Sequence, residues 1–311
     1  MKPTNLKDYR TLSNVTASSE DLIVQSTKMD FEENSYNNEL WKYSKNTWKK
    51  FKGSKGKNFS MPQYSNNRKL TSYVKSEKKG KKEVLNSLCV QSGSSIKVVF
   101  ETKDTIQSYF WDSKDKFIFI TTKEWSKSFK SIEDKEMEPL YLENIPFRFD
   151  TRGIIYNKRN HVYKVNVLSQ KNQKIIDGDK ENLISIGSVV ESGNSIYFTA
   201  SSYNEAGSML DEKIIKKTGN NLKTIHSKGM WGKLFIFKDE LYGIGLNNRF
   251  DWPTNTSIHQ IKNTGETNIL YPDLDRTIIN VKCVDNFMYI LYEDSGKQLL
   301  SRGDGVDLEK L

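Results

Sequence analysis

Three histidines, His161, His226 and His259, are the residues of this chain best suited to acid–base or metal chemistry. A transition-metal site needs several His or Cys ligands at short spacing, and none of the three has such a neighbour. His161 stands in an apolar, strand-like run, where a packed or hydrogen-bonded structural role is commoner than catalysis. His226 and His259 are weaker candidates still. We therefore expect no metal site.

Two pairs of carboxylates close in sequence could serve as general acid and base, as in glycoside-hydrolysing enzymes. They are Glu32 with Glu33, and Asp134 with Glu136. Both pairs stand in polar stretches, which is typical of solvated charge. The sequence also contains no Gly-x-Ser-x-Gly nucleophile elbow and no Gly-x-x-x-x-Gly-Lys-Ser/Thr phosphate loop. We expect no catalytic residue and no cofactor.

The two cysteines, Cys89 and Cys283, each fall inside a strand-like run, so two buried thiols are a better interpretation than a disulfide. No apolar stretch follows the first positive charges, and no window approaches the roughly 18 apolar residues of a membrane span. These features indicate a soluble, cytoplasmic protein without a membrane partner.

The chain is basic, with 48 Lys and Arg against 39 Asp and Glu and a formal net charge of +9. Clustered positive charge binds nucleic-acid phosphate, so a nucleic-acid partner is a third hypothesis. The densest run, Lys75–Lys82, lies between two strand-like segments, as a solvated hairpin tip would. Lys also outnumbers Arg heavily, whereas Arg makes most specific base contacts. Nucleic acid is therefore a poor candidate.

Composition and pattern favour an all-β protein. Aromatic residues make up 12% of the chain, and together with Ile and Val they suit the half-buried surface of a strand. Short strand-like runs alternate with turn residues throughout the sequence. A chain of 311 residues could hold two domains, but propellers of this length form one.

The strand-like runs group into six weakly repeated units of roughly 40 to 55 residues, near the length of a four-stranded propeller blade. Each small sheet of a propeller buries its faces against its neighbours and leaves only short edges. We therefore predict a single β-propeller domain over residues 1–311, with six to seven four-stranded blades and the last one missing or incomplete. The units begin near Asp21, Lys69, Ser108, Ser195, Lys233 and Ile278.

Several segments resemble the N-terminal propeller of acylaminoacyl peptidases of the prolyl oligopeptidase family. Trp111 with Asp112–Phe119 is similar to a Trp-Ser-Pro-Asp-Gly-Lys turn followed by an apolar strand, and Tyr64–Val74 is similar to the same unit. Ile145–Tyr156 resembles a Pro-Tyr-Arg-Phe-Asp-Gly turn, and 158–167 resembles an Arg-Arg-x-His strand. Ile176-Asp-Gly-Asp179 resembles the end of a blade.

The chain departs from the family pattern at several points. Thr151 stands where the family has the Gly of the Asp-Gly turn, and several turns have lost Pro or Gly. Relatives have seven blades, whereas only about six units are countable here. From the resemblance, Arg148, Asp150, His161 and Trp111 are structural motif residues. Asp150 is expected to accept backbone N–H bonds across its turn, with Phe147 and Phe149 packed beside it.

The resemblance implies a non-catalytic propeller that gates access of peptide substrates to a serine peptidase. In the family, the catalytic triad belongs to a C-terminal α/β-hydrolase domain, which this chain lacks. The expected partner is therefore a peptidase catalytic domain, in the same protein or in another. The polar and aromatic segment 123–141 could dock that partner. The alternative is a stand-alone propeller that serves as a protein-interaction scaffold.

Overall fold

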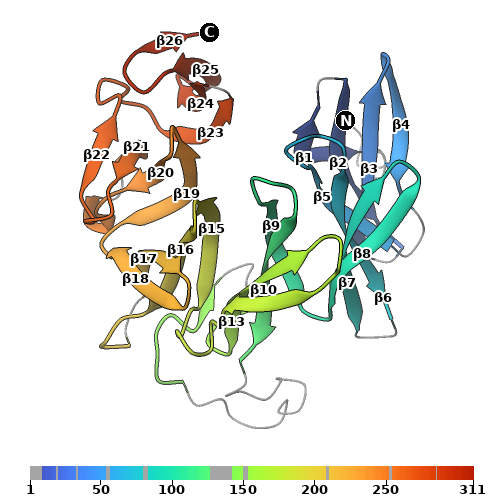
Figure 1. Cartoon of the computed structure of the whole chain (residues 1–311), viewed down its shortest axis with the longest axis horizontal. Coiled ribbons are helices and arrows are strands. Elements are labelled where there is room, and N and C mark those ends of the chain that lie inside the picture. The colour runs from blue at the N-terminus through green and yellow to red at the C-terminus, as the bar shows by residue number, and fades with distance from the viewer. Residues whose placement is uncertain are drawn as a thin grey trace. The chain divides into compact units, whose positions relative to one another are not determined.

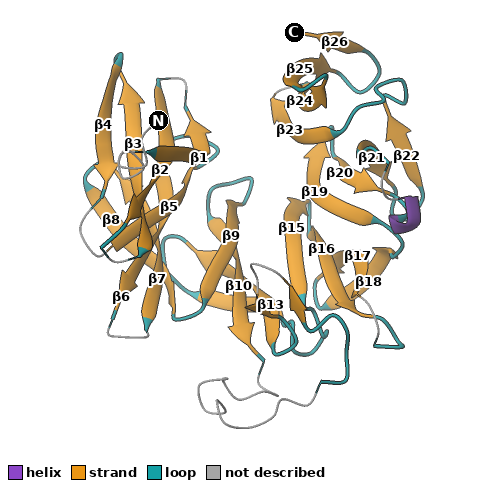
Figure 2. Ribbon diagram, turned by 180° about the vertical axis from the view of Figure 1, so that it is seen from behind, coloured by secondary structure: helices purple, strands orange, loops and turns teal. Residues whose placement is uncertain are grey.

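The computed structural model describes residues 9–18, 20–32, 34–53, 57–79, 83–126, 142–149, 153–207, 210–251, 254–284 and 286–311. In these ranges the regular secondary structure is almost entirely β-strand (Figures 1 and 2). The only helix in them is one turn of 3-10 helix, η3 at Arg249–Asp251. None of the described helices is long and apolar enough to cross a membrane.

Six four-stranded antiparallel sheets make up the fold, which is a six-bladed β-propeller, as predicted from the repeat. We number the sheets one to six in chain order. The chain divides into two compact units. The first unit comprises residues 1–124 and 160–177, and the second comprises 125–159 and 178–311.

The first unit contains sheets one and two and almost all of sheet three. In each, strands that follow one another along the chain lie side by side. Sheet one contains β1 (Arg10–Ala17), β2 (Asp21–Asp30), β3 (Ser35–Ser44) and β4 (Thr47–Lys52). Sheet two contains β5 (Lys57–Tyr64), β6 (Thr71–Lys78), β7 (Val84–Ser92) and β8 (Ser95–Thr102). Sheet three contains β9 (Thr105–Trp111), β10 (Phe117–Trp125), β13 (Lys158–Asn166) and β14 (Asn172–Ile176).

The second unit holds sheets four to six and a small hairpin of β11 (Arg148–Phe149) with β12 (Gly153–Ile154). Sheet four contains β15 (Ser185–Ser192), β16 (Ser195–Tyr203), β17 (Leu210–Thr218) and β18 (Asn221–His226). Sheet five contains β19 (Met230–Phe237), β20 (Glu240–Leu246), β21 (Ser257–Ile261) and β22 (Thr267–Leu270). Sheet six contains β23 (Ile278–Val284), β24 (Phe287–Asp294), β25 (Lys297–Gly303) and β26 (Leu308–Lys310).

The cores lie between consecutive sheets of each unit. In the first unit, Val74 and Leu88 of sheet two pack in one cluster with Ile118, Ile120 and Val165 of sheet three. In the second unit, one cluster joins sheets four and five, and another joins sheets five and six. Burying an aliphatic side chain contributes about 1.5–3 kcal/mol, so the sheets stabilise one another through these contacts.

A β-bulge recurs in the first strand of every one of the six sheets. Each of these strands carries one more residue than its partner across the bulge, at the register shifts in β1, β5, β9, β15, β19 and β23. A bulge bends its strand and increases the local twist. Because the bulge lies in the first strand of each sheet, the six sheets share a structural repeat that is not visible as sequence identity between them.

The sequence-based repeat units coincide with the sheets, but the first strands β1, β5 and β15 and the last strand β26 were not among the predicted runs. The described part of the basic run, residues 75–79, belongs to the hairpin of β6 and β7, and the Lys79 N–H donates to the Glu83 carbonyl at 2.9 Å. Residues 80–82 of the run lie outside the described residues. Cys89 is a buried free thiol, whereas Cys283 is only half-buried.

Candidate functional site

The four motif residues lie in different surroundings. Trp111 ends β9, is buried, and donates its indole N–H to Ser72 Oγ at 3.0 Å. His161 is buried in β13. Arg148 is exposed in β11, and Asp150 lies outside the described residues. Phe147, expected to pack beside its turn, is 40% exposed.

The turn after Trp111 is closed by one carboxylate. Asp112 is 5% exposed, and its Oδ1 accepts the backbone N–H groups of Lys116 and Phe117, both at 2.7 Å. Asp115 occupies the left-handed region with φ of 55°, a conformation in which the family has a glycine and which Asp tolerates better than most residues. The turn therefore keeps its geometry without the family's Pro and Gly.

This turn is hydrogen-bonded to the second family-like segment. Asp115 Oδ1 accepts the Asn66 N–H at 2.7 Å and the Asn66 side-chain amide at 2.9 Å. Asp115 Oδ2 accepts the Asn67 N–H at 2.8 Å, and the Asn66 amide also donates to the Asp112 carbonyl at 2.7 Å. The two segments that carry the family resemblance thus join sheets two and three, and their role is structural.

His161 lies between two carboxylates in the first unit. Its Nε2 is 3.6 Å from Glu124 Oε2, and its Nδ1 is 3.3 Å from Asp177 Oδ1. The ring is 1% exposed. Glu124 and Asp177 face different ring nitrogens of His161. The arrangement is that of a buried histidine whose two ring nitrogens each face a carboxylate.

Further polar groups surround Glu124. Its Oε1 accepts the Tyr163 hydroxyl at 2.8 Å, and its Oε2 is 3.5 Å from Lys174 Nζ. Burial, followed by the negative charge of Glu124, raises the pKa of Asp104 above its usual value. Burial, aided by the bond to Glu124, also raises the pKa of Tyr163. Apart from the buried His161, these ionisable side chains are half-buried, and sequence reasoning identified only His161 among them.

The second unit holds a cluster that joins His226 and His259, which the sequence analysis named separately, through Trp231. The Trp231 ring meets the rings of His226 and His259 edge-on, at centroid distances of 5.5 and 5.3 Å. Two glycines leave space for the Trp231 ring. A Cβ atom on Gly229 would lie 2.0 Å from Trp231 Nε1, and one on Gly243 would lie 2.8 Å from Trp231 Cε3. His226 and Trp231 are close in sequence, but His259 lies 28 residues beyond Trp231 on another strand, so no local pattern could have linked all three.

The two histidines of this cluster differ in their polar contacts. His226 has Nδ1 3.1 Å from the Gly265 carbonyl oxygen and Nε2 2.8 Å from that of Asn247. His259 is 2% exposed, and neither of its nitrogens forms a hydrogen bond of good geometry. Burial lowers the pKa of His259 below its usual value. Among the described residues, the hydrogen-bonding partners of the His226 ring are backbone carbonyl oxygens, which fits a structural role.

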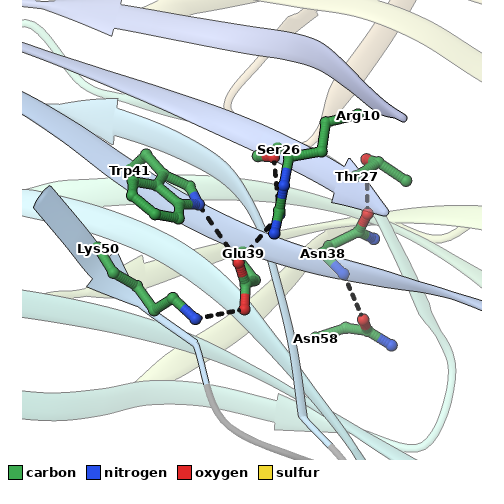
Figure 3. A network of polar contacts seen from close by, with 8 residues as sticks. All are labelled: Arg10, Ser26, Thr27, Asn38, Glu39, Trp41, Lys50 and Asn58. Carbon is green, nitrogen blue, oxygen red and sulfur yellow. Dashed lines mark hydrogen bonds and ion pairs between the residues drawn. The ribbon is translucent and has the colours of Figure 1, made fainter. Parts of the chain in front are cut away.

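A charged network covers sheet one (Figure 3). Glu39 accepts from Lys50 Nζ at 2.7 Å and from Trp41 Nε1 at 3.3 Å, and Arg10 Nη1 lies 3.3 Å away. Burial opposes ionisation, but the bond to Lys50 and the nearby charges hold the pKa of Glu39 below its usual value. Because the Glu39 carboxylate already interacts with three donor groups, we assign it a structural rather than a catalytic role. Asn38 extends the network to sheet two, since its N–H donates to Asn58 Oδ1 at 2.7 Å.

Comparison with known proteins gives the fold. No protein-family model and no curated protein matches the sequence. Among solved structures, the acylaminoacyl peptidase of Pyrococcus horikoshii matches 98% of this chain and 46% of its own, with a TM-score of 0.74 and 14% identity. The β-propeller domain of the Trilobed protease from Pyrococcus furiosus matches 97% of this chain and 84% of its own, with a TM-score of 0.68 and 14% identity.

A puromycin-hydrolyzing peptidase of Mycobacterium tuberculosis also matches, over 98% of this chain and 46% of its own, with a TM-score of 0.63 and 12% identity. The chain therefore spans less than half the length of these two peptidases and most of the isolated propeller. The resemblance predicted from the motif residues is confirmed as a shared propeller fold.

Proposed function

We propose that this propeller acts beside a serine peptidase catalytic domain, in the same protein or in a partner, and restricts its substrates to short peptides. The observation that carries the proposal is the match of nearly the whole chain to less than half of each peptidase. The chain contains no nucleophile elbow of its own. Its part in the reaction is therefore access, and the chemistry belongs to the other domain.

A domain that restricts access works by excluded volume, so it needs a stiff frame more than reactive groups. The bonds of Asp115 to the second family-like segment provide stiffness of this kind between sheets two and three. Packing of apolar clusters between consecutive sheets adds to it. Short peptides would pass such a frame, whereas folded chains would not.

The test is to isolate the native protein from the cytoplasmic fraction of source cells, the location we propose, with an antibody against this chain. A fluorophosphonate probe then labels any active serine hydrolase that is present. We expect one labelled species that cleaves short acyl-peptide reporters but not folded proteins. The isolated 311-residue chain should cleave no reporter above buffer and should take up no probe. Absence of a labelled hydrolase from the native preparation contradicts the proposal.

The second candidate is a stand-alone protein-interaction scaffold. Large apolar side chains are exposed at the hairpin of β2 and β3, where Phe31 is 56% exposed and Tyr36 is 61% exposed. Exposed aromatic residues are enriched in protein interfaces. If the protein is a scaffold, the antibody should co-precipitate partner proteins that the fluorophosphonate probe does not label. Loss of those partners in a Phe31→Ser, Tyr36→Ser variant would favour this function.

A further inference from the structure

Sheet six of the second unit packs on a neighbour through only one of its faces. That face contacts sheet five through a cluster that includes Val281, Met288 and Ile290. Every position of β20 in sheet five after Glu240 is buried, whereas burial alternates along β24, the equivalent strand of sheet six. Among the described sheets of the second unit, sheet five is therefore covered on both faces and sheet six on one. We call the other face of sheet six its outer face.

The outer face is apolar along its centre. Side chains that lie opposite each other in a strand pair share a face, so the register places Leu291 of β24 beside Leu300 of β25. It also places Val284 of β23 beside Phe287 of β24. The exposed fractions are 41% for Leu300, 42% for Val284 and 37% for Phe287. A solvated face of an antiparallel sheet normally carries polar side chains, so this composition suits a face that another protein surface covers.

A row of four side chains crosses the outer face, with one from each strand. Lys282 of β23 is the register partner of Tyr289 of β24. Tyr289 is in turn opposite Arg302 of β25, and Arg302 is opposite Glu309 of β26. Arg302 also forms an ion pair with Glu309 and lies 4.8 Å from the centre of the Phe287 ring. The order across the sheet is therefore Lys, Tyr, Arg, Glu.

This order is complementary to itself when it is reversed. A two-fold axis parallel to the strands brings two copies of the outer face together and reverses the strand order in the partner. Lys282 then faces the partner's Glu309, and Tyr289 faces the partner's Arg302. Each of these contacts forms twice, as an ion pair and as a cation–π contact. In the adjacent row, Leu291 faces the partner's Leu300, so apolar side chains meet apolar side chains.

The balance of charge also favours a second copy as the occupant. Lys282 and Arg302 offset Glu309 and Glu293, which follows Leu291 on the same face of β24. A strongly acidic or strongly basic partner would meet no opposite net charge here, whereas a second copy meets matched pairs.

We propose that the outer face of sheet six binds the same face of a second copy of this chain, about a two-fold axis parallel to the strands. One four-stranded face is small beside the roughly 800 Å² that each partner buries in a standard interface. The dimer is therefore weak, with a dissociation constant in the micromolar range. It is independent of the proposed function, since it needs no catalytic domain.

The test follows the mass of the full chain by sedimentation velocity, from about 1 μM to about 300 μM. We expect a monomer at the lower end of this range and a dimer at the upper end. Leu300→Lys places a charged side chain against the partner's Leu291, so it should weaken the dimer at least about tenfold. Lys310→Glu is the control, because Lys310 is exposed and lies opposite Ser301 on the other face of the sheet. It should leave the dimer unchanged, and melting temperatures of all variants check the fold.

A charge exchange tests the arrangement of the row. Lys282→Glu brings a second carboxylate to the partner's Glu309, and Glu309→Lys brings a second ammonium group to the partner's Lys282. Each variant alone should therefore dimerise about threefold to tenfold more weakly. In an equimolar mixture of the two variants, every mixed dimer again holds two pairs of opposite charge, and its affinity should return toward that of the unchanged chain.

Three results would overturn the proposal. The first is a chain that stays monomeric at every concentration. The second is a dimer that Leu300→Lys leaves intact, and the third is a mixture of the charge variants that associates no better than either variant alone.

Discussion

At the scale of single residues, Asp112 illustrates how a motif position acts through hydrogen bonds. Replacement by Ala removes the acceptor for the backbone N–H groups of Lys116 and Phe117 at a position that is 5% exposed. We expect the free energy of unfolding to fall by about 1–3 kcal/mol, measured by urea denaturation. The matched control is Asp273→Ala, an exposed turn residue, which should stay within about 0.5 kcal/mol. Equal effects of the two changes would contradict a structural role for the motif.

His259 provides a second test at this scale, because burial lowers its pKa in the folded protein. The His259 ring binds a proton at about pH 6.5 in the unfolded chain, but only at a lower pH in the folded protein. The contribution of His259 to the free energy of unfolding is therefore fully present above about pH 6.5. It is lost as the pH falls from there through the pKa of the ring in the folded protein.

The chain has only three histidines, so their ring C–H signals can be followed separately by NMR during a pH titration. We expect the signal that His259→Gln removes to titrate below pH 6.5. A midpoint at or above 6.5 would show that burial does not govern this ring. His226→Gln identifies the neighbouring signal and serves as the control for assignment.

At the scale of elements, the turns and bulges determine how the strands pair. The β3–β4 turn uses Lys45 and Asn46, both at positive φ, 49° and 58°. Changing them to Asn-Gly suits this turn type, because Gly adopts positive φ without the steric cost that other residues carry, and should give a higher urea midpoint. Lys49→Gln on the exposed face of β4 controls for loss of charge. An unchanged or lower midpoint for the Asn-Gly variant would mean that the turn does not limit stability.

At the scale of the whole molecule, the net charge of +9 is the property with the clearest consequence. Many of its lysines are engaged on the surface, as Lys50 is with Glu39 and Lys103 with Glu83. We expect weak binding to duplex DNA that disappears as salt rises through about 0.15 M, because screening weakens dispersed charges. Fluorescence anisotropy of a labelled duplex measures this. Tight binding that persists at that salt concentration would favour a nucleic-acid function.

The sequence by itself determined the fold class, the six repeat units and the turns that carry the family resemblance. These features depend on local signals: apolar runs for β10 and β20, which pack on both faces, and turn residues at hairpin ends. Strands β1, β5 and β15 escaped prediction for two physical reasons. β1 is almost wholly exposed. β5 contains Pro62 and β15 contains Gly187, and both residue types weaken the sequence pattern of a strand.

Only the tertiary structure decided which polar side chains meet. The pairing of Asp115 with Asn66 spans 49 residues, and the rings of His226 and His259 meet on Trp231 across sheets four and five. Such contacts depend on how neighbouring sheets stack and twist, and a periodic pattern within one strand carries no information about its neighbour in the next sheet.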